Sequence, residues 1–185
     1  MNQQIETLYG FVDPQIIDIA KDIRLLICDV DGVFSDGRIY MGNDGEELKT
    51  FHTLDGYGIK CLMKAGVEIA VITGRKSNIV ANRMQALGVQ HLYQGQDDKD
   101  LAYQDLCQKL NIAPQHCGYI GDDLIDWPVM KQVGLQVCVA NGHPLLKRRA
   151  NYITTVLGGY GAVREVCDLI LQAKDELELH QGLSI

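Results

Sequence analysis

Short apolar runs rich in branched residues alternate along the chain with longer segments of helical spacing. The runs that predict buried strands are 23–30, 67–73, 91–95, 117–123 and 135–140. Apolar residues between them recur every three to four positions, as in an amphipathic helix, at 58–66, 77–88 and 98–111. Strands that alternate with helices form a parallel sheet covered by helices on both faces. The pattern therefore predicts an α/β fold, Rossmann-like and three-layered, as a single domain over residues 1–185.

One insertion interrupts this alternation after the first predicted strand. The stretch RIYMGNDGEELKTF places short apolar segments on both sides of the turn-rich GNDGE. This pattern is typical of a β-hairpin, so we expect a hairpin flap at about 36–52, beside the first strand and outside the main sheet. The remaining spacing between the predicted strands leaves no room for a cap domain. The final segment, about 175–185, is expected to form a C-terminal tail.

Composition and charge narrow the class of protein. Hydrophobic residues make up 46% of the chain and charged residues 22%, which is typical of a globular protein. The net charge of −7, with no basic cluster longer than KRR, argues against binding to a nucleic acid backbone. No apolar run reaches the roughly eighteen residues of a membrane helix, and the first residues lack the pattern of a secretory signal. We therefore expect a cytoplasmic protein with neither nucleic acid nor membrane as a partner.

Charged and polar residues gather where the predicted strands end. These residues are Asp29, Asp31, Thr73, Gly74, Arg75, Lys99, Asp122, Asp123 and Asp126. In an open α/β sheet the carboxyl ends of the strands form the edge where ligands bind. Crowded carboxylates repel one another, and a hard divalent cation such as Mg²⁺, bound through oxygen ligands, removes that repulsion. A lysine, a threonine and backbone N–H groups would hold a phosphate beside the cation.

The spacing of Asp29 and Asp31 fits one kind of phosphate chemistry. A carboxylate held against a phosphate can attack phosphorus and form an aspartyl-phosphate. A second carboxyl group two residues along can protonate the leaving alcohol and then activate the hydrolytic water. The strand ends therefore favour phosphate chemistry through an aspartyl-phosphate.

Four motifs carry a resemblance to a known family. DVDGV, a strand ending in TG, a downstream lysine and GDDLID occur in the order and at the strand ends typical of the haloacid dehalogenase-like phosphatases, over residues 24–141. The resemblance implies Asp29 as the nucleophile and Asp31 as the general acid and base. It also implies phosphate binding by Thr73, Gly74 and Lys99.

The same resemblance implies a magnesium site. Its ligands would be the Asp29 carboxylate, the backbone carbonyl of Asp31 and the Asp122 carboxylate. Asp123 or Asp126 would then orient a metal-bound water or Lys99 from outside the ligand set, and the sequence leaves open which of the two does so.

A narrower resemblance covers most of the chain. VDGVFSDGRIY, FHTLDGYGIK, ITGRKS and GGYGAVRE are similar to the family that dephosphorylates 3-deoxy-D-manno-octulosonate 8-phosphate for lipopolysaccharide precursors. The resemblance implies a homotetramer without cap domains, in which the C-terminal tail can reach a neighbouring subunit's active site. Arg75 and Arg164 are candidates for the substrate carboxylate, because arginine offers a bidentate fork.

Two alternatives share parts of this pattern. One is a phosphatase for a related nine-carbon sugar acid phosphate. The other is a phospho-receiver module, which also uses an aspartyl-phosphate, Mg²⁺, a threonine and a lysine. Receivers place the paired acids before the phosphoacceptor, whereas here the DD pair comes last. They also keep their phosphate, so they need no general acid two residues after the acceptor.

Overall fold

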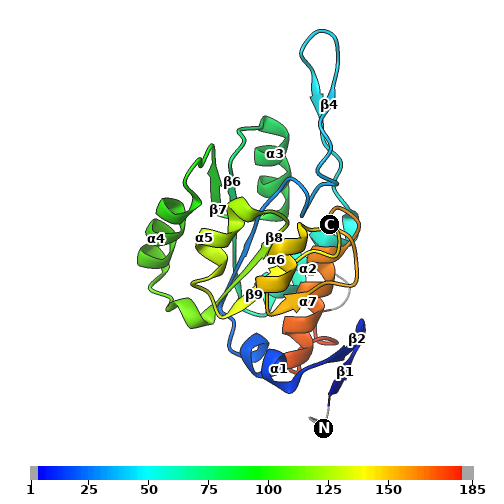
Figure 1. Cartoon of the computed structure of the whole chain (residues 1–185), viewed down its shortest axis with the longest axis vertical. Coiled ribbons are helices and arrows are strands. Elements are labelled where there is room, and N and C mark those ends of the chain that lie inside the picture. Colours follow the sequence, from blue (N-terminus) through cyan, green and yellow to red (C-terminus); the bar gives the residue numbers. More distant parts are fainter. Residues whose placement is uncertain (1–3, 181–185) are drawn as a thin grey trace.

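The computed structural model describes residues 4–180 and has a six-stranded parallel sheet at its centre (Figure 1). The strands, in their order across the sheet, are β10 Tyr152–Ile153, β9 Leu135–Cys138, β8 Cys117–Gly121, β3 Leu25–Cys28, β6 Glu68–Thr73 and β7 His91–Gln94. Every pair of neighbouring strands runs parallel. The predicted α/β class is therefore confirmed, and β3, which leads to Asp29, lies between β8 and β6.

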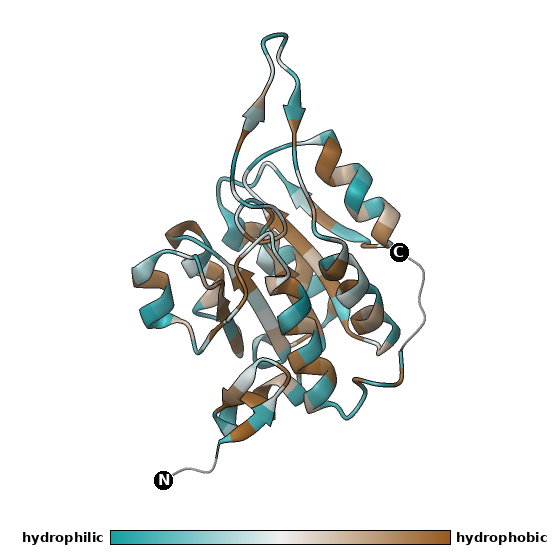
Figure 2. Ribbon diagram, turned by 90° about the vertical axis from the view of Figure 1, so that its right-hand side faces the viewer, coloured by the Kyte–Doolittle hydropathy of each residue, from teal (hydrophilic) through white to brown (hydrophobic). Residues whose placement is uncertain are grey.

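Helices cover both faces of the sheet and complete three layers (Figure 2). One face carries α1 Pro14–Lys21, α2 Thr53–Lys64, α3 Asn78–Leu87 and α7 Ala162–Ala173; the other carries α4 Lys99–Leu110, α5 Trp127–Met130 and α6 Pro144–Arg149. The period of two along β3 explains both cores. Leu26 and Cys28 pack with the first set of helices, whereas Leu25 and Ile27 pack with the second. No cap domain is inserted among the residues that the structure describes.

Two antiparallel ribbons lie outside the main sheet. The first joins β1 Ile5–Thr7 to β2 Gly10–Val12. The second joins β4 Tyr40–Met41 to β5 Glu47–Leu48 within the expected hairpin segment, and it projects from the body of the molecule in Figure 1. The role of this hairpin as a flap stays a prediction.

Two 3₁₀ turns, η1 Pro114–His116 and η2 Leu124–Asp126, precede and follow β8. Of the expected C-terminal tail, residues 181–185, which include GLSI, lie outside the described residues. Between residues 4 and 180, none of the helices has the length and apolar character required to cross a bilayer.

Candidate active site

The loop after β3 turns back sharply and holds two carboxylates at the sheet edge. The Asp29 N–H still donates to Ile120 O of β8, at 3.0 Å, so Asp29 continues the pairing of the sheet and is only 6% exposed. The next residues wrap around one acceptor, because the N–H groups of residues 33–35 all donate to Val30 O, at 2.9–3.2 Å. Gly32 has φ +91°, a backbone conformation that glycine adopts without strain. The loop therefore needs glycine directly after Asp31.

The expected strand-end residues meet around one cavity of about 220 Å³. Its lining comes from the loop after β3, the end of β6 and the loop after it, the start of α4 and the segment after β8. It consists of Asp29, Asp31, Thr73, Gly74, Arg75, Lys99, Asp122, Asp123 and Ile125. Thr73, the last residue of β6, is 3% exposed. The structure thus brings every candidate from the strand ends to this cavity except Asp126, which lies buried beside it.

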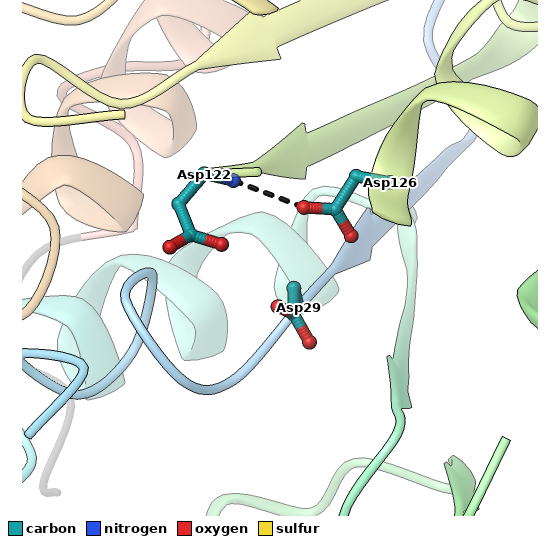
Figure 3. Close-up of side chains that lie close together, drawn as sticks. All are labelled: Asp29, Asp122 and Asp126. Atoms are coloured by element: carbon teal, nitrogen blue, oxygen red, sulfur yellow. Dashed lines mark hydrogen bonds between the residues drawn. The ribbon is translucent and has the colours of Figure 1, made fainter. Parts of the chain in front are cut away.

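Three carboxylates crowd together at this edge (Figure 3). One oxygen from each of Asp29, Asp122 and Asp126 lies within 4.8 Å of the others. Burial, followed by the charge of Asp126, raises the pKa of Asp29 to about 6 despite the nearby Lys99. Burial and the charges of Asp126 and Asp29 raise the pKa of Asp122 to about 7. Burial and mutual repulsion destabilise the ionised forms of these carboxylates. A hard divalent cation such as Mg²⁺, which binds oxygen ligands, would relieve that repulsion, so the three carboxylates fit such a cation.

Among the described residues, Lys99 is the basic residue that pairs with this carboxylate cluster. It opens α4, is 3% exposed, and places its Nζ 2.9 Å from Asp29 Oδ1 and 2.7 Å from Asp126 Oδ1. Burial disfavours the charged ammonium, but the carboxylates of Asp126 and Asp29 outweigh burial and raise the pKa of Lys99. Lys99 therefore stays charged at neutral pH and faces the same cavity as Asp29.

Asp126 supports this arrangement from below the cavity. Its Oδ1 accepts hydrogen bonds from Lys99, and from Tyr119 Oη at 2.7 Å. Its Oδ2 accepts from the backbone N–H groups of Asp122, at 3.0 Å, and Asp123, at 3.3 Å. The Asp123 side chain instead accepts from the N–H of Leu124, at 2.7 Å, and is exposed. Of the two candidates for a supporting role, the geometry favours Asp126.

The hairpin contributes residues that sequence reasoning missed. Lys49 contacts Asp31 Oδ1, and it also lies 3.2 Å from Glu47. Arg75 Nη2 lies 3.1 Å from Glu47, and Arg75 Nε lies 3.8 Å from Asp31 Oδ2. The available signal was the alternation in ELK, which places Glu47 and Lys49 on one face of the hairpin and Leu48 on the other. The alternation does not indicate that this face of the hairpin contacts Asp31.

Arg164 lies elsewhere. Its Nε is 2.8 Å from Asp168, one turn along α7, and its guanidinium lies 5.1 Å from the ring centre of Tyr57 on α2. Arg164 lies near the start of α7, next to α2, and it lines a different cavity together with Tyr57 and Asp168. The structure therefore does not bring this candidate to the cavity that contains Asp29.

The GGYG stretch before Arg164 contributes through its backbone instead. The N–H of Gly159 donates to Val33 O at 2.8 Å, and a Cβ at Gly158 would overlap Gly32 O. Buried Glu165 accepts from the N–H groups of Thr155 and Val156, at 2.9–3.0 Å, and so holds the start of this stretch. These contacts brace the loop that carries Asp31.

Comparisons with known proteins agree with this geometry. Residues 91–159 match the family model of the haloacid dehalogenase-like hydrolases. The chain is 59% identical over 181 residues to the 3-deoxy-D-manno-octulosonate 8-phosphate phosphatase KdsC of Yersinia pestis, covering 98% of this chain and 97% of that protein. KdsC of Escherichia coli strain K12 is 58% identical over 181 residues, with 98% and 96% covered.

Solved structures show the same likeness. The crystal structure of the Yersinia pestis phosphatase matches with a TM-score of 0.98 and 58% identity over 100% of both chains. The phosphatase of Moraxella catarrhalis, crystallised in complex with a magnesium ion, a phosphate ion and a KDO molecule, matches with a TM-score of 0.87 and 45% identity, covering 89% of this chain and 95% of that one. The chain belongs to the 3-deoxy-D-manno-octulosonate 8-phosphate phosphatases, within the haloacid dehalogenase-like hydrolases.

Proposed function

We propose that the chain is a Mg²⁺-dependent phosphomonoesterase that hydrolyses 3-deoxy-D-manno-octulosonate 8-phosphate to the free sugar acid and inorganic phosphate. The observation that carries this proposal is the cluster of Asp29, Asp122 and Asp126 around Lys99, beside a cavity at the carboxyl edge of the sheet. Relatives that are 58–59% identical over 98% of the chain carry the name of this phosphatase. Family membership and site geometry support the same reaction.

Asp29 is the proposed nucleophile. Its carboxylate attacks phosphorus, the bond to the sugar oxygen breaks, and an aspartyl-phosphate forms. Lys99, Thr73 and the N–H of Gly74 line the same cavity and would hold the phosphate oxygens during this step. Asp29 is 6% exposed and faces this cavity, where the phosphate would bind.

Asp31 is the proposed general acid and base. It gives a proton to the departing sugar oxygen and then takes a proton from the water that attacks the aspartyl-phosphate. The second step returns Asp29 as a carboxylate and releases inorganic phosphate. Asp31 is again protonated, ready for the next leaving group.

Magnesium would be held by the Asp29 carboxylate, the backbone carbonyl of Asp31 and the Asp122 carboxylate. When bound, it neutralises the crowded carboxylates and the incoming phosphate. Asp126 would position Lys99 and the backbone of Asp122 through the hydrogen bonds described above.

The exposed apolar residues of the hairpin support assembly of several copies. Met41 is 74% exposed, Leu48 is 68% exposed and Ile39 is 52% exposed. We propose a homotetramer of single-domain subunits in which a neighbouring subunit covers the cavity, with the hairpin and the C-terminal tail as its closing elements. Exclusion of water from the reacting phosphate is the physical reason for such a cover. A single 20.5 kDa species in sedimentation would contradict the assembly.

The place of this reaction in the cell is part of the proposal. The free sugar acid would serve lipopolysaccharide precursor biosynthesis in the cytoplasm, as the narrower sequence resemblance implies. Arg75, which lines the cavity, is the proposed contact for the substrate carboxylate.

A panel of phosphate esters tests the proposed substrate. Phosphate release is measured for 3-deoxy-D-manno-octulosonate 8-phosphate, a nine-carbon sugar acid phosphate, a neutral hexose phosphate and 4-nitrophenyl phosphate. We expect the eight-carbon acid to have the highest kcat/KM, by more than about tenfold over the neutral hexose phosphate, since that ester lacks the carboxylate that Arg75 is proposed to contact. An equal or higher kcat/KM for the neutral sugar phosphate or the nine-carbon acid would overturn the assignment.

A further inference from the structure

The hairpin supplies a buried cation to Asp31 from 18 residues further along the chain. Lys49 Nζ contacts Asp31 Oδ1, and it lies 3.2 Å from Glu47 Oε1. Its side chain is 1% exposed, although the next residue on the hairpin, Leu48, is 68% exposed. Burial of an ammonium is unfavourable unless carboxylates pair with it. The two acidic partners therefore account for the inward position of Lys49.

Arg75 closes a ring of alternating charges with these residues. From the end of β6, its Nη2 lies 3.1 Å from Glu47 Oε2 and its Nε lies 3.8 Å from Asp31 Oδ2. Each oxygen of Asp31 thus has its own cation, Lys49 at Oδ1 and Arg75 at Oδ2. The hydroxyl of Ser35, at 3.3 Å from Oδ1, adds one longer contact from the same loop. We call Glu47, Lys49 and Arg75 the Asp31 clamp.

We propose that Lys49 is a positioning residue for the proton transfers of Asp31, and that the Asp31 clamp couples the place of the hairpin to those transfers. This inference rests on the proposed function, in which Asp31 is the general acid and base. A carboxylate with a cation at each oxygen is restrained against rotation about its bond to Cβ. Proton transfer needs heavy atoms about 2.6–3.2 Å apart, and a misplacement of about 1 Å can lower a rate by about 10²-fold.

A purely structural role for Lys49 would lower the global free energy of unfolding when its charge is lost, whereas a positioning role would not. The strands β4 and β5 form their own two-stranded sheet and share no pairing with the central sheet. Within the hairpin segment 36–52, Phe51 near its end is the residue that packs against a buried core cluster, and Lys49 belongs to neither cluster. Loss of the Lys49 charge should therefore leave the global free energy of unfolding nearly unchanged, and an effect on chemistry would have to act through Asp31.

Two substitutions separate the charge of Lys49 from its shape. Lys49→Met keeps an unbranched apolar stem and removes the ammonium, whereas Lys49→Arg keeps a positive charge. Lys131→Met is the matched control, because Lys131 is exposed and lies directly after α5, away from the hairpin. Glu47→Gln is a second test, since Glu47 bridges Lys49 and Arg75.

The measurement uses 4-nitrophenyl phosphate, whose leaving group departs without an acid. Its kcat/KM reports formation of the aspartyl-phosphate, and its kcat includes hydrolysis, which needs Asp31. We expect Lys49→Met to lower kcat by roughly 10–100-fold, to keep kcat/KM within about threefold, and to accumulate phospho-enzyme in acid-quenched samples. Lys49→Arg should recover most of the loss, Glu47→Gln should show the same split, and Lys131→Met should match wild type.

Two results would overturn the proposal. A fall in kcat/KM with kcat unchanged would make Lys49 a binding residue, and wild-type values for Lys49→Met would leave it no part in the reaction. The aryl phosphate keeps this test separate from the proposed substrate. If wild type hydrolysed 4-nitrophenyl phosphate but not the sugar acid phosphate, the substrate assignment would fail while the kcat and kcat/KM values would still decide the role of Lys49.

Discussion

The ammonium of Lys99 lies 2.9 Å from the carboxylate of Asp29, at the end of a strand with parallel neighbours on both sides. The same ammonium lies 2.7 Å from Asp126, and Asp122 brings a third carboxylate within 4.8 Å of the other two. One lysine cannot balance three carboxylates. Burial, together with the remaining negative charge, raises the pKa values of Asp29 and Asp122, and this charge is the electrostatic basis for a magnesium site here.

The pH dependence of stability should reveal this charge. The pKa of Asp29 rises from 3.8 to about 6 and that of Asp122 from 3.8 to about 7. A group with a raised folded-state pKa contributes stability that is full below its unfolded pKa and is lost as pH rises through the folded pKa. Without Mg²⁺, this contribution should fall between about pH 4 and pH 7. Because one pKa unit corresponds to about 1.4 kcal/mol, the change is on the order of a few kcal/mol.

Urea denaturation with and without MgCl₂ measures this contribution. The stabilisation by Mg²⁺ should be larger at pH 8 than at pH 5, since protonated carboxyl groups are poor ligands. Asp122→Asn, which removes one of the titrating groups, should reduce the difference between the two pH values. An equal effect of Mg²⁺ at both pH values would argue against a cation among these carboxylates.

Substitutions in the DD pair should separate the roles of its members. Asp122→Ala should abolish Mg²⁺-dependent phosphate release, because it removes a proposed ligand. Asp123→Ala should retain activity within about tenfold of wild type, since the Asp123 side chain is exposed and caps η2. Steady-state kinetics in a MgCl₂ titration check both variants, and full wild-type turnover in excess EDTA would rule out a metal requirement.

Tyr119→Phe tests the support beneath the site. The buried Tyr119 hydroxyl donates to Asp126 Oδ1 at 2.7 Å, and a hydrogen bond to a charged group contributes about 1.5–3 kcal/mol. We expect the free energy of unfolding to fall by that amount and kcat to fall only a few-fold, because Asp126 keeps its contact with Lys99. Tyr160→Phe is the control, since Tyr160 is 53% exposed. Equal unfolding free energies for the two variants would show that the Tyr119 hydroxyl does not stabilise the protein through Asp126.

Gly158→Ala should disturb the loop that carries Asp31. The added methyl group would overlap Gly32 O, which is backbone and cannot move aside as a flexible side chain can. Gly42→Ala is a suitable control, because its methyl group would meet only the end of the Glu46 side chain. We expect Gly158→Ala to lower kcat by more than tenfold and to lower the unfolding midpoint in a thermal melt, with little change for Gly42→Ala. Wild-type activity of Gly158→Ala would show that the brace is dispensable.

The main sheet could be predicted from sequence because its long strands are continuous apolar runs. The predicted strands at 23–30 and 67–73 contain β3 and β6. The prediction ended these strands at polar residues, and the first of them, Asp29, still forms a backbone hydrogen bond to β8. The two-residue strand β10 was missed, since two residues show no period. Helix α7 was also not predicted, although its apolar residues Val163, Val166, Cys167 and Ile170 recur at helical spacing.

The residues of the site were also predicted only in part. Asp29, Thr73, Lys99 and Asp122 were predicted to meet because strand ends in a parallel sheet share an edge, and the structure places them around one cavity. Lys49 was missed because its contact with Asp31 depends on how the hairpin folds back, which no local pattern encodes. The direction of Arg164 was equally inaccessible, since it depends on the packing of α7 against α2.

The central claim is that Asp29 carries the phosphoryl group during turnover. The most direct test is mass spectrometry of Asp31→Asn after acid quenching during reaction with 4-nitrophenyl phosphate. Attack by Asp29 needs no acid with this leaving group, whereas hydrolysis needs the base that the variant lacks. The account predicts one added phosphoryl group on the peptide that contains Asp29, and none in Asp29→Asn. A phosphoryl group on any other peptide, or a wild-type enzyme that keeps its phosphate for minutes, would contradict it.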